Sequence, residues 1–203
     1  MIVIIDYDMG NLASIKNMFR KIGYEDVLIS KSPQDIMNAD KYILPGVGSF
    51  DQGVKNLKFS GLYEVVKDEV ILKKKPILGI CLGMQLLGRF SEEGNLKGLE
   101  LLPFNSIKFS LGDDFKIPHM GWDEVEVKKR DPLVDNMIGN EQRFYFVHSY
   151  HAQCDDASSV LMTCNYGYTF AAAVFGQNVY GVQFHPEKSH RFGKRLFENY
   201  IRI

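Results

Sequence analysis

The apolar residues in the first half of the chain follow two alternating patterns. Unbroken apolar runs at residues 2–5, 27–29 and 42–44 predict buried strands, because a strand covered on both faces shows no polar alternation. Between these runs, apolar residues recur every three or four positions, which is the spacing of an amphipathic helix. Strands that alternate with helices in this way predict a mainly parallel sheet flanked by helices.

Local signals mark where these elements begin and end. The first helix is predicted to end near residue 23, with an apolar face formed by Leu12, Ile15, Met18, Phe19 and Ile22. Ser32, followed by a proline, predicts the N-cap of a second, short helix. A glycine-containing loop at 45–49 then leads through amphipathic stretches to a strand at 76–80. Cys81 lies where this strand meets a new helical pattern.

The second half of the chain has a different pattern. Its β-rich runs are separated by short polar or glycine-containing turns, and they lie at residues 144–150, 159–164, 170–175 and 179–184. Hairpins and antiparallel pairing are expected there. A closing helix is predicted from His190 to Arg202, with an inward face of Phe192, Leu196, Phe197 and Tyr200. We therefore predict an α/β fold with a central, mainly parallel sheet and an additional antiparallel β region.

Length and composition narrow the class of protein. A chain of 203 residues, 45% hydrophobic and 24% charged, fits one globular domain covering residues 1–203. No stretch approaches the roughly 20 apolar residues of a membrane span. The N-terminus lacks the basic start of a secretory signal and is expected to be a buried strand. These features predict a protein without a membrane partner.

Charge and cysteine content exclude further classes. A net charge of −1 provides no basic field for nucleic acid, and the basic clusters at 73–75 and 128–130 are expected to be solvated surface. Three cysteines without CxxC spacing fit neither a disulfide framework nor a zinc site. We therefore expect a reducing compartment, the cytoplasm, and at least one thiol that is free to react.

The first candidate for chemistry is the strand-to-helix corner at Cys81. Residues 79–83 read G-x-C-x-G, the cysteine form of a nucleophile elbow, in which small residues allow a strained turn that exposes the reactive atom. The helix N-terminus favours a thiolate and can stabilise an oxyanion. The alternative is that Cys81 is a small buried hydrophobe, which is the usual state of a free cysteine. The elbow alone leaves both interpretations open.

A second stretch favours the interpretation of Cys81 as a nucleophile. Residues 181–187, GVQFHPE, end an apolar strand with His185, a proline and Glu187. An imidazole can move the thiol proton while a carboxylate fixes its tautomer, so these residues supply what a cysteine nucleophile requires. Each of them alone would more often be structural. Together with Cys81 they predict a catalytic triad.

Several segments resemble one known family. Three of them are similar to the signatures of class I glutamine amidotransferases, in the same order: PGVGSF at 45–50, GICLGMQ at 79–85 and GVQFHPEKS at 181–189. Three more resemble the glutaminase subunits of imidazole glycerol phosphate synthases in histidine biosynthesis: IIDYDMGNL at 4–12, IPHMGWDEV at 117–125 and YFVHSYH at 145–151. The likeness covers essentially the whole chain.

The resemblance implies roles for individual residues. The catalytic triad corresponds to Cys81, His185 and Glu187. The oxyanion region corresponds to the backbone of Val47 and Gly48 and the N–H of Leu82. The positions that bind substrate glutamine correspond to Gln85, Glu93, Ser149 and Tyr150, and those that face a partner to Asn11, Trp122 and Lys188.

The resemblance also implies a reaction and a partner. L-glutamine would be hydrolysed through a glutamyl thioester without metal or organic cofactor. The ammonia would pass to a second chain, a (β/α)₈ cyclase, because the motifs leave no length for an acceptor domain. In the family, glutaminase activity waits until the partner holds its ligand, and glycines at 46 and 48 would permit the 45–49 loop to flip a peptide.

Three departures from the family pattern leave the acceptor open. Asp8 replaces a usual glycine, Asp123 a usual asparagine, and Gly88-Arg89 stands where bulky or acidic residues are common. Segments 14–19 and 187–193 resemble paralogues that supply ammonia to an N-acetyl sugar amidotransferase in surface-polysaccharide biosynthesis. The histidine-pathway partner is favoured. Two further alternatives are a free-standing cysteine hydrolase of γ-glutamyl bonds and a non-catalytic scaffold subunit.

Overall fold

The first half of the chain forms the parallel part of a mixed sheet. A computed structural model describes residues 1–203, and its strands β2, β1, β3 and β4 lie side by side in that order, all parallel. The strands are β1 (Ile2–Ile5), β2 (Val27–Ser30), β3 (Lys41–Leu44) and β4 (Ile77–Ile80). The helices of this half are α1 (Leu12–Lys21), α2 (Pro33–Asn38), α3 (Phe50–Phe59), α4 (Leu62–Ile71) and α5 (Leu82–Leu87).

The second half extends the same sheet in antiparallel fashion. Strand β11 (Val179–Val182) joins the two parts, because it pairs parallel with β4 and antiparallel with β10. The other strands are β5 (Phe104–Lys108), β6 (His119–Val127), β7 (Arg143–His148), β8 (Tyr150–Cys154), β9 (Val160–Tyr166) and β10 (Tyr168–Gly176). From β11 the order continues through β10, β9 and β6 to β7, while β8 pairs with β10 and β5. Helix α6 (His190–Arg202) closes the fold.

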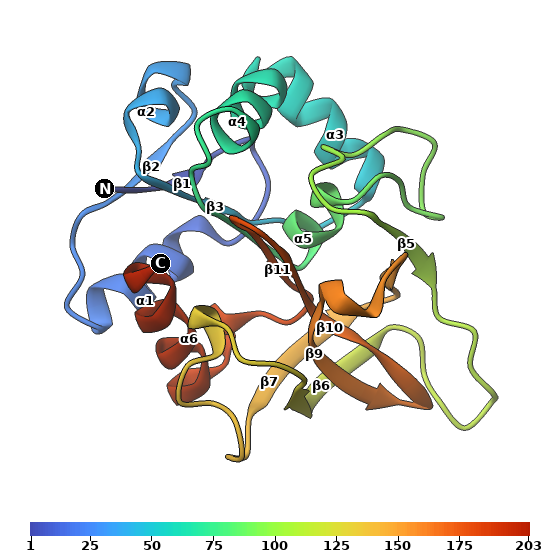
Figure 1. Cartoon of the computed structure of the whole chain (residues 1–203). Helices are drawn as coiled ribbons and strands as arrows, with labels where there is room; N and C mark the ends of the chain where they lie inside the picture. The colour runs from blue at the N-terminus through green and yellow to red at the C-terminus, as the bar shows by residue number, and fades with distance from the viewer.

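The sheet separates two apolar cores, one on each face. Alternate residues of β1 point to opposite faces, so Ile2 and Ile4 enter one core while Val3 and Ile5 enter the other. The first core lies under α1 and α6, and the second under α2, α3 and α4, which Figure 1 shows on the other side of the sheet. Burial on both faces explains why the parallel strands read as unbroken apolar runs.

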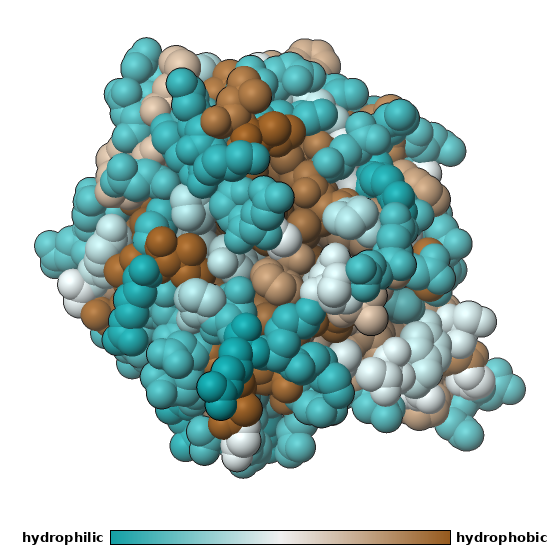
Figure 2. All heavy atoms as spheres, viewed as in Figure 1, coloured by the Kyte–Doolittle hydropathy of each residue, from teal (hydrophilic) through white to brown (hydrophobic).

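The distribution of polar residues on the surface agrees with the prediction that the basic clusters are solvated. Hydrophilic residues cover most of the face in Figure 2, and apolar atoms reach the surface near α4. Lys73 and Lys74 are exposed, as is Lys128, so these basic residues are solvated as expected. No helix is long and apolar enough to span a membrane.

The predicted fold class is confirmed, and the misses fall in the second half. The run at 144–150 is not one strand, because the chain turns at Ser149 between β7 and β8. Strands β5 and β6 were not predicted at all.

Ser32 does occupy the N-cap position of α2, but its side chain makes no capping bond. Its N–H donates to Ser30 Oγ (3.0 Å), and that hydroxyl donates to Asp35 Oδ2 (2.6 Å).

Two of the three departures from the family pattern lie in well-defined local structure. Asp8 has a φ of +64°, a left-handed conformation that favours glycine, and its N–H donates to Asp6 Oδ1 at 3.1 Å. The absence of a side chain at Gly88 leaves room for the ring of Phe104, since a Cβ at position 88 would lie 2.6 Å from that ring. Arg89 forms a fork to Asp155, with N–O distances of 2.8 and 2.5 Å. None of these residues contacts the predicted triad.

Candidate active site

Cys81 occupies a strained corner between β4 and α5. Its φ of +54° and ψ of −112° are rare for any residue with a side chain. Two backbone hydrogen bonds hold it there: its N–H donates to Val182 O at 2.8 Å, and its carbonyl accepts from Gln85 N at 3.2 Å. A conformation of this kind costs about 1–3 kcal/mol, so the surrounding strands must impose it. The elbow predicted from the sequence is therefore present in the backbone.

The glycines around Cys81 are required by close packing. A Cβ on Gly83 would lie 1.8 Å from the carbonyl oxygen of Leu44 at the end of β3. A Cβ on Gly79 would lie 2.6 Å from Gly83 O. Helix α5 therefore approaches the strands more closely than any side chain would allow, and this approach sets the position of the thiol.

We expect Gly83→Ala to disrupt the elbow. The added methyl group overlaps a backbone oxygen, which cannot move without shifting β3, so the free energy of unfolding should fall by about 3 kcal/mol or more. Urea denaturation measures this change. The matched control is Gly112→Ala, because a Cβ at Gly112 meets no atom within 4 Å. Equal stability of the two variants would contradict this account of the packing.

His185 and Glu187 form a buried pair beside this corner. Nδ1 of His185 lies 2.8 Å from Oε1 of Glu187, and each side chain is only 1% exposed. Both backbone groups of His185 are hydrogen-bonded. Its N–H donates to Tyr145 O (2.9 Å), and its carbonyl oxygen accepts from Ser189 Oγ (2.6 Å). Nε2 of His185 has no hydrogen-bond partner. The carboxylate thus fixes one nitrogen of the imidazole and leaves the other available.

The surroundings make His185 an unusually strong base. Burial by itself lowers the pKa of His185, but interactions with Cys81 and Glu187 outweigh it and raise the pKa to about 9. Cys81 and His185 line the same cavity, so the thiol and the imidazole face a common space. At the two remaining cysteines, burial raises the pKa of Cys154 to about 11 and that of Cys164 to about 12. Both of these thiols stay protonated near neutral pH.

Stability should depend on pH through His185. Its pKa is raised from 6.5 in the unfolded chain to about 9, so the stabilisation is complete below about pH 6.5 and is lost as the pH rises to about 9. The full loss is at most about 3 kcal/mol. Urea denaturation of the protein and of His185→Gln should show the difference between them shrinking over this range.

A second histidine provides the control for this experiment. Burial lowers the pKa of His151, so the stability it contributes is present above its unfolded pKa and is not lost as the pH rises from 6.5 to 9. The stability difference between the protein and His151→Gln should therefore stay constant. A constant difference for His185→Gln as well would contradict the raised pKa.

A cavity of about 280 Å³ opens beside Cys81, a size that suits a small molecule. It is lined by Val47, Gly48, Cys81, Leu82, Gln85, Glu93, Pro118, Val147, His148, Ser149, Tyr150 and His185. All residues expected for the oxyanion region and for the substrate lie in this lining, as do two members of the predicted triad. The third, Glu187, stands behind His185.

Two side chains of the lining are anchored by hydrogen bonds. Oε2 of Glu93 accepts from the N–H of Phe50 at 2.8 Å, which ties the carboxylate to the start of α3. Nε2 of Gln85 donates to Tyr150 O (3.3 Å) and to Gln183 Oε1 (3.2 Å). Gln183 was not singled out in the sequence, although it lies within the GVQFHPE segment. Its Nε2 donates to Cys81 Sγ at 3.8 Å.

The residues expected to face a partner are exposed and interconnected. Trp122 is 39% exposed and stacks on His190, with ring centroids 5.5 Å apart. Tyr145 links them, because Trp122 lies 6.3 Å from its ring and Lys188 Nζ lies 5.6 Å from it. The 3-10 turn η3 (Pro186–Lys188) packs against α1, the helix that Asn11 precedes.

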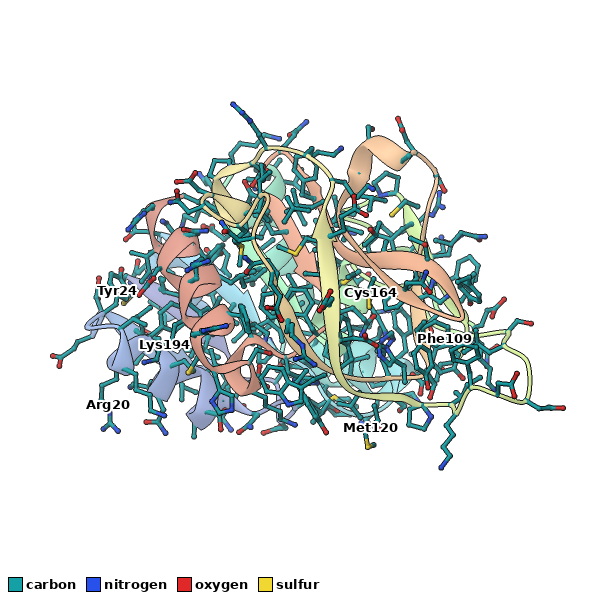
Figure 3. The ribbon with its side chains drawn as sticks, turned by 90° about the horizontal axis from the view of Figure 1, so that it is seen from below. Arg20, Tyr24, Phe109, Met120, Cys164 and Lys194 are labelled. Carbon is teal, nitrogen blue, oxygen red and sulfur yellow. The ribbon has the colours of Figure 1, made fainter.

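Other apolar side chains are exposed on the same side of the molecule. Met120 lies on β6 two residues before Trp122, is 61% exposed, and projects from the lower edge of Figure 3. Val47, in the lining of the cavity, is 44% exposed. Sequence reasoning missed Met120, because a single exposed methionine has no periodic signal.

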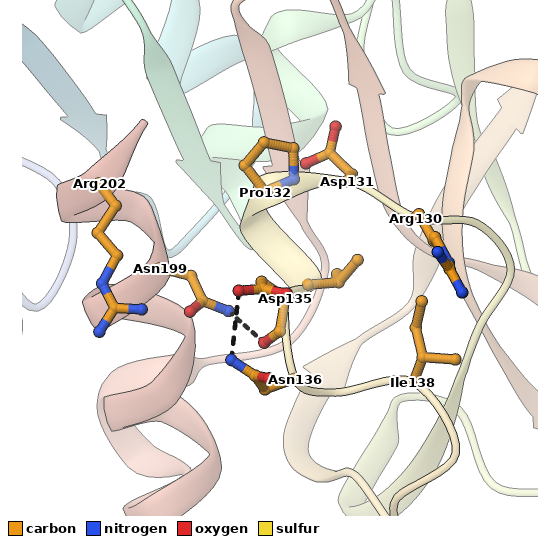
Figure 4. A pocket seen from close by; sticks show the side chains of 9 residues that line it. Arg130, Asp131, Pro132, Asp135, Asn136, Ile138, Asn199 and Arg202 are labelled. Atoms are coloured by element: carbon orange, nitrogen blue, oxygen red, sulfur yellow. Dashed lines mark hydrogen bonds between the residues drawn. The ribbon is translucent and has the colours of Figure 1, made fainter.

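A larger hollow lies elsewhere on the protein and has no cysteine or serine in its lining. It has a volume of about 620 Å³ and lies between α6 and the 3-10 turn η1 (Pro132–Val134), as Figure 4 shows. There, Asn199 Nδ2 donates to the carbonyls of Leu133 (3.0 Å) and Asp135 (2.9 Å), so its amide holds η1 against the helix. No group of three or more His, Cys, Asp or Glu side chains anywhere in the chain could hold a metal ion.

Comparisons with known proteins agree with this geometry. The family model described as "Glutamine amidotransferase class-I" matches residues 3–203. The chain is 54% identical over 202 residues to "Imidazole glycerol phosphate synthase subunit HisH 2" of Methanococcus maripaludis, covering 100% of this chain and 99% of that protein. It is 48% identical to a protein of the same name from Pseudomonas aeruginosa, with 100% of both chains covered.

Solved structures show the same fold at low identity. One described as "Crystal structure of glutamine amidotransferase" superposes with a TM-score of 0.76 at 17% identity, covering 98% of this chain and 97% of that one. The structure of PurLQS from Thermotoga maritima gives a TM-score of 0.73 at 19% identity, covering 99% and 97% of the two chains.

Proposed function

The chain belongs to the class I glutamine amidotransferase family, and on that premise we propose that it is the glutaminase subunit of an imidazole glycerol phosphate synthase. It hydrolyses L-glutamine to glutamate and ammonia, and the ammonia passes to a partner synthase. The observation that carries this proposal is the strained Cys81 beside the buried His185–Glu187 pair at a small cavity.

The proposed reaction proceeds through a covalent intermediate. The Cys81 sulfur attacks the side-chain amide carbon of glutamine, and the carbonyl oxygen becomes an oxyanion. His185 then protonates the amide nitrogen, which leaves as ammonia, and a glutamyl thioester remains. Water attacks the thioester while His185 takes up its proton, and glutamate leaves with the thiol restored. Glu187 keeps the imidazole in the orientation that this proton transfer requires.

Donors for the oxyanion are proposed at the mouth of the elbow. The N–H groups in the first turn of a helix have no partner inside the helix, so that of Leu82 is free to donate. The backbone of Val47 and Gly48 lines the same cavity, and the φ of +107° at Gly48 allows conformations closed to other residues. Gln85, Glu93, Ser149 and Tyr150 would surround the amino-acid end of the substrate.

A partner is proposed because the ammonia needs an acceptor. Free ammonia is mostly protonated near neutral pH and reacts poorly, so a second active site must consume it. The relatives are named as synthase subunits. We propose a (β/α)₈ cyclase as this partner, bound over the exposed surface around Asn11, Trp122 and Lys188, and we propose the cytoplasm as the compartment.

Reconstitution tests this function. The purified chain is mixed with the cyclase, and glutamine-dependent formation of imidazole glycerol phosphate is measured alongside ammonia-dependent formation. We expect the complex to use glutamine and the lone chain to turn it over at least about tenfold more slowly, because the partner completes the site. A complex that uses ammonia but not glutamine would rule out the proposed function.

A second acceptor is supported by specific observations. Asp123 departs from the histidine-pathway pattern, and segments 14–19 and 187–193 resemble paralogues that act in surface-polysaccharide biosynthesis. The alternative partner is an N-acetyl sugar amidotransferase that takes ammonia from the same glutaminase chemistry. Copurification with each partner in turn distinguishes the two, since only the true partner should be retained and support glutamine use.

A further inference from the structure

A line of hydrogen bonds leads inward from the half-exposed side chain of Asp123. Its Oδ2 lies 3.0 Å from Nε2 of His119, whose Nδ1 lies 3.1 Å from Nε2 of His148. Nδ1 of His148 in turn lies 2.8 Å from the carbonyl oxygen of Tyr150. His119 is 2% and His148 6% exposed, so both imidazoles are removed from water. Asp123, His119 and His148 together form what we name the histidine array.

Strand pairing and aromatic contacts hold the histidine array in place. His119 on β6 stands opposite His148 on β7 in the antiparallel register. The ring of His119 is enclosed between Tyr166, with centroids 4.0 Å apart, and Phe146, with centroids 4.8 Å apart. Phe109, labelled in Figure 3, packs on both histidines. Neither imidazole has room to turn toward other partners.

The three contacts of the array require a fixed number of protons. A carbonyl oxygen can only accept, so Nδ1 of His148 donates to Tyr150 O. The three contacts need three hydrogens, whereas two neutral imidazoles and an ionised carboxylate supply only two. The array as built therefore carries one additional proton, whichever member holds it. Its summed charge is zero, which suits a buried site.

The carbonyl of Tyr150 also sets the donor and acceptor directions of the hydrogen bonds that lead through Gln85 and Gln183 to Cys81. Because Tyr150 O only accepts, the amide of Gln85 must present its Nε2 to it. That nitrogen also donates to Gln183 Oε1, which leaves Nε2 of Gln183 facing the sulfur of Cys81 at 3.8 Å. An N–H directed at sulfur stabilises negative charge there. Each orientation in this series depends on the one before it.

We propose that Asp123, His119 and His148 are positioning residues that fix the Tyr150 carbonyl and, through Gln85 and Gln183, the donor that faces the Cys81 sulfur. This rests on the proposed glutaminase function. An amide at position 123 would supply the third hydrogen covalently, whereas the array with Asp123 needs an additional proton that can be lost to solvent. The histidine array is therefore a proton-dependent element beside the cavity that His148 lines.

The charged groups around the array place the additional proton at its outer end. Burial lowers the pKa of His148 to about 3, and His151 and His185 face it and act in the same direction. Burial also lowers the pKa of His119, and the opposing contact with Asp123 reduces this effect without reversing it. His148 is therefore neutral, and the third proton lies between His119 and Asp123. Rising pH removes that proton, which leaves two acceptors facing each other.

Nuclear magnetic resonance of the chain labelled with ¹⁵N-histidine tests the array without any activity. We expect His148 to be neutral with its hydrogen on Nδ1 from pH 5 to 9. His119 should bind and release a proton within this range in the native protein. In Asp123→Asn it should stay neutral, with its hydrogen on Nδ1. A hydrogen on Nε2 of His148, or titration of His119 that Asp123→Asn leaves unchanged, would overturn the array.

Activity of the complex tests the positioning role. Asp123→Leu and His148→Leu should lower glutamine-dependent synthesis by up to about 100-fold with ammonia-dependent synthesis unchanged, because a small displacement of the reacting groups has effects of that size. Asp123→Asn should keep near-native activity, and His148→Asn should recover part of it by presenting an amide N–H to Tyr150 O.

The outcomes separate this proposal from the proposed function. A folded Asp123→Leu or His148→Leu variant with native glutamine use would show that the array does not position the site. An inactive native complex would instead refute the proposed function, and the tautomer measurements would still decide whether the array exists. If Asp123→Asn loses as much activity as Asp123→Leu, the proton count is wrong.

Discussion

Cys81→Ala is expected to abolish glutamine-dependent synthesis while the complex keeps its ammonia-dependent synthesis. Without the sulfur no thioester can form, and the loss of turnover should be at least about 10⁴-fold, as for removal of a nucleophile from a triad. The proposed cyclase site lies on the partner chain, so supplied ammonia should bypass the defect. Steady-state rates with glutamine and with ammonium salt, measured on the same preparation, give both values.

The remaining cysteines provide the control. Cys154→Ala removes a half-buried thiol with a raised pKa and should leave both activities close to native. Retention of glutamine use in Cys81→Ala would refute the nucleophile. A native chain that never uses glutamine with any partner would favour a scaffold subunit, and a lone chain that is fully active would favour a free-standing γ-glutamyl hydrolase.

Glu187→Gln should have the second largest effect, with glutamine-dependent turnover reduced by about 10²–10⁴-fold. The amide has almost the same shape but no charge, so it can present its nitrogen to Nδ1 of His185 and select the wrong tautomer. The side chain is 1% exposed, so water cannot replace it. Binding of glutamine should change little, because Glu187 lies behind the cavity lining; kcat should fall and KM stay similar.

The pH profile of this variant adds a second readout. Glu187 helps to raise the pKa of His185 against the opposing effect of burial, so Glu187→Gln should shift the pKa of His185 downward. Glu141→Gln is the matched control, because Glu141 is exposed and remote from the cavity lining. A native profile and a native rate in Glu187→Gln would show that the carboxylate has no part in catalysis.

The sequence predicted most of what depends on local pattern. Strands β1 to β4 are buried on both faces and read as apolar runs, and the elbow at Cys81 has glycines that its packing requires. Those signals lie within a few residues of the feature they predict. The family resemblance then identified nine of the twelve residues that line the cavity, but not Pro118, Val147 or His148, and Glu187 lies behind His185 outside the lining.

The antiparallel half was harder to predict because its pairing is long-range. The turn at Ser149 interrupts no apolar pattern, so one run appeared where β7 and β8 are two strands. The histidine array could not be foreseen, since His119 and His148 meet only through the pairing of β6 with β7. Gln183 sits in a strongly patterned segment, but its contact with Cys81 depends on β11 lying beside β4.

The central position of β11 has a consequence for folding. Strand β4 carries Cys81 at its end, yet one of its two edges is covered only by β11, about a hundred residues later in the chain. During synthesis the ribosome must produce that late segment before the edge can close. His185 and Glu187 follow β11 directly, so sheet closure and delivery of the base happen in one step. A nascent chain that lacks this segment therefore has neither His185 nor Glu187 beside Cys81, and the proposed triad is complete only when the sheet is complete.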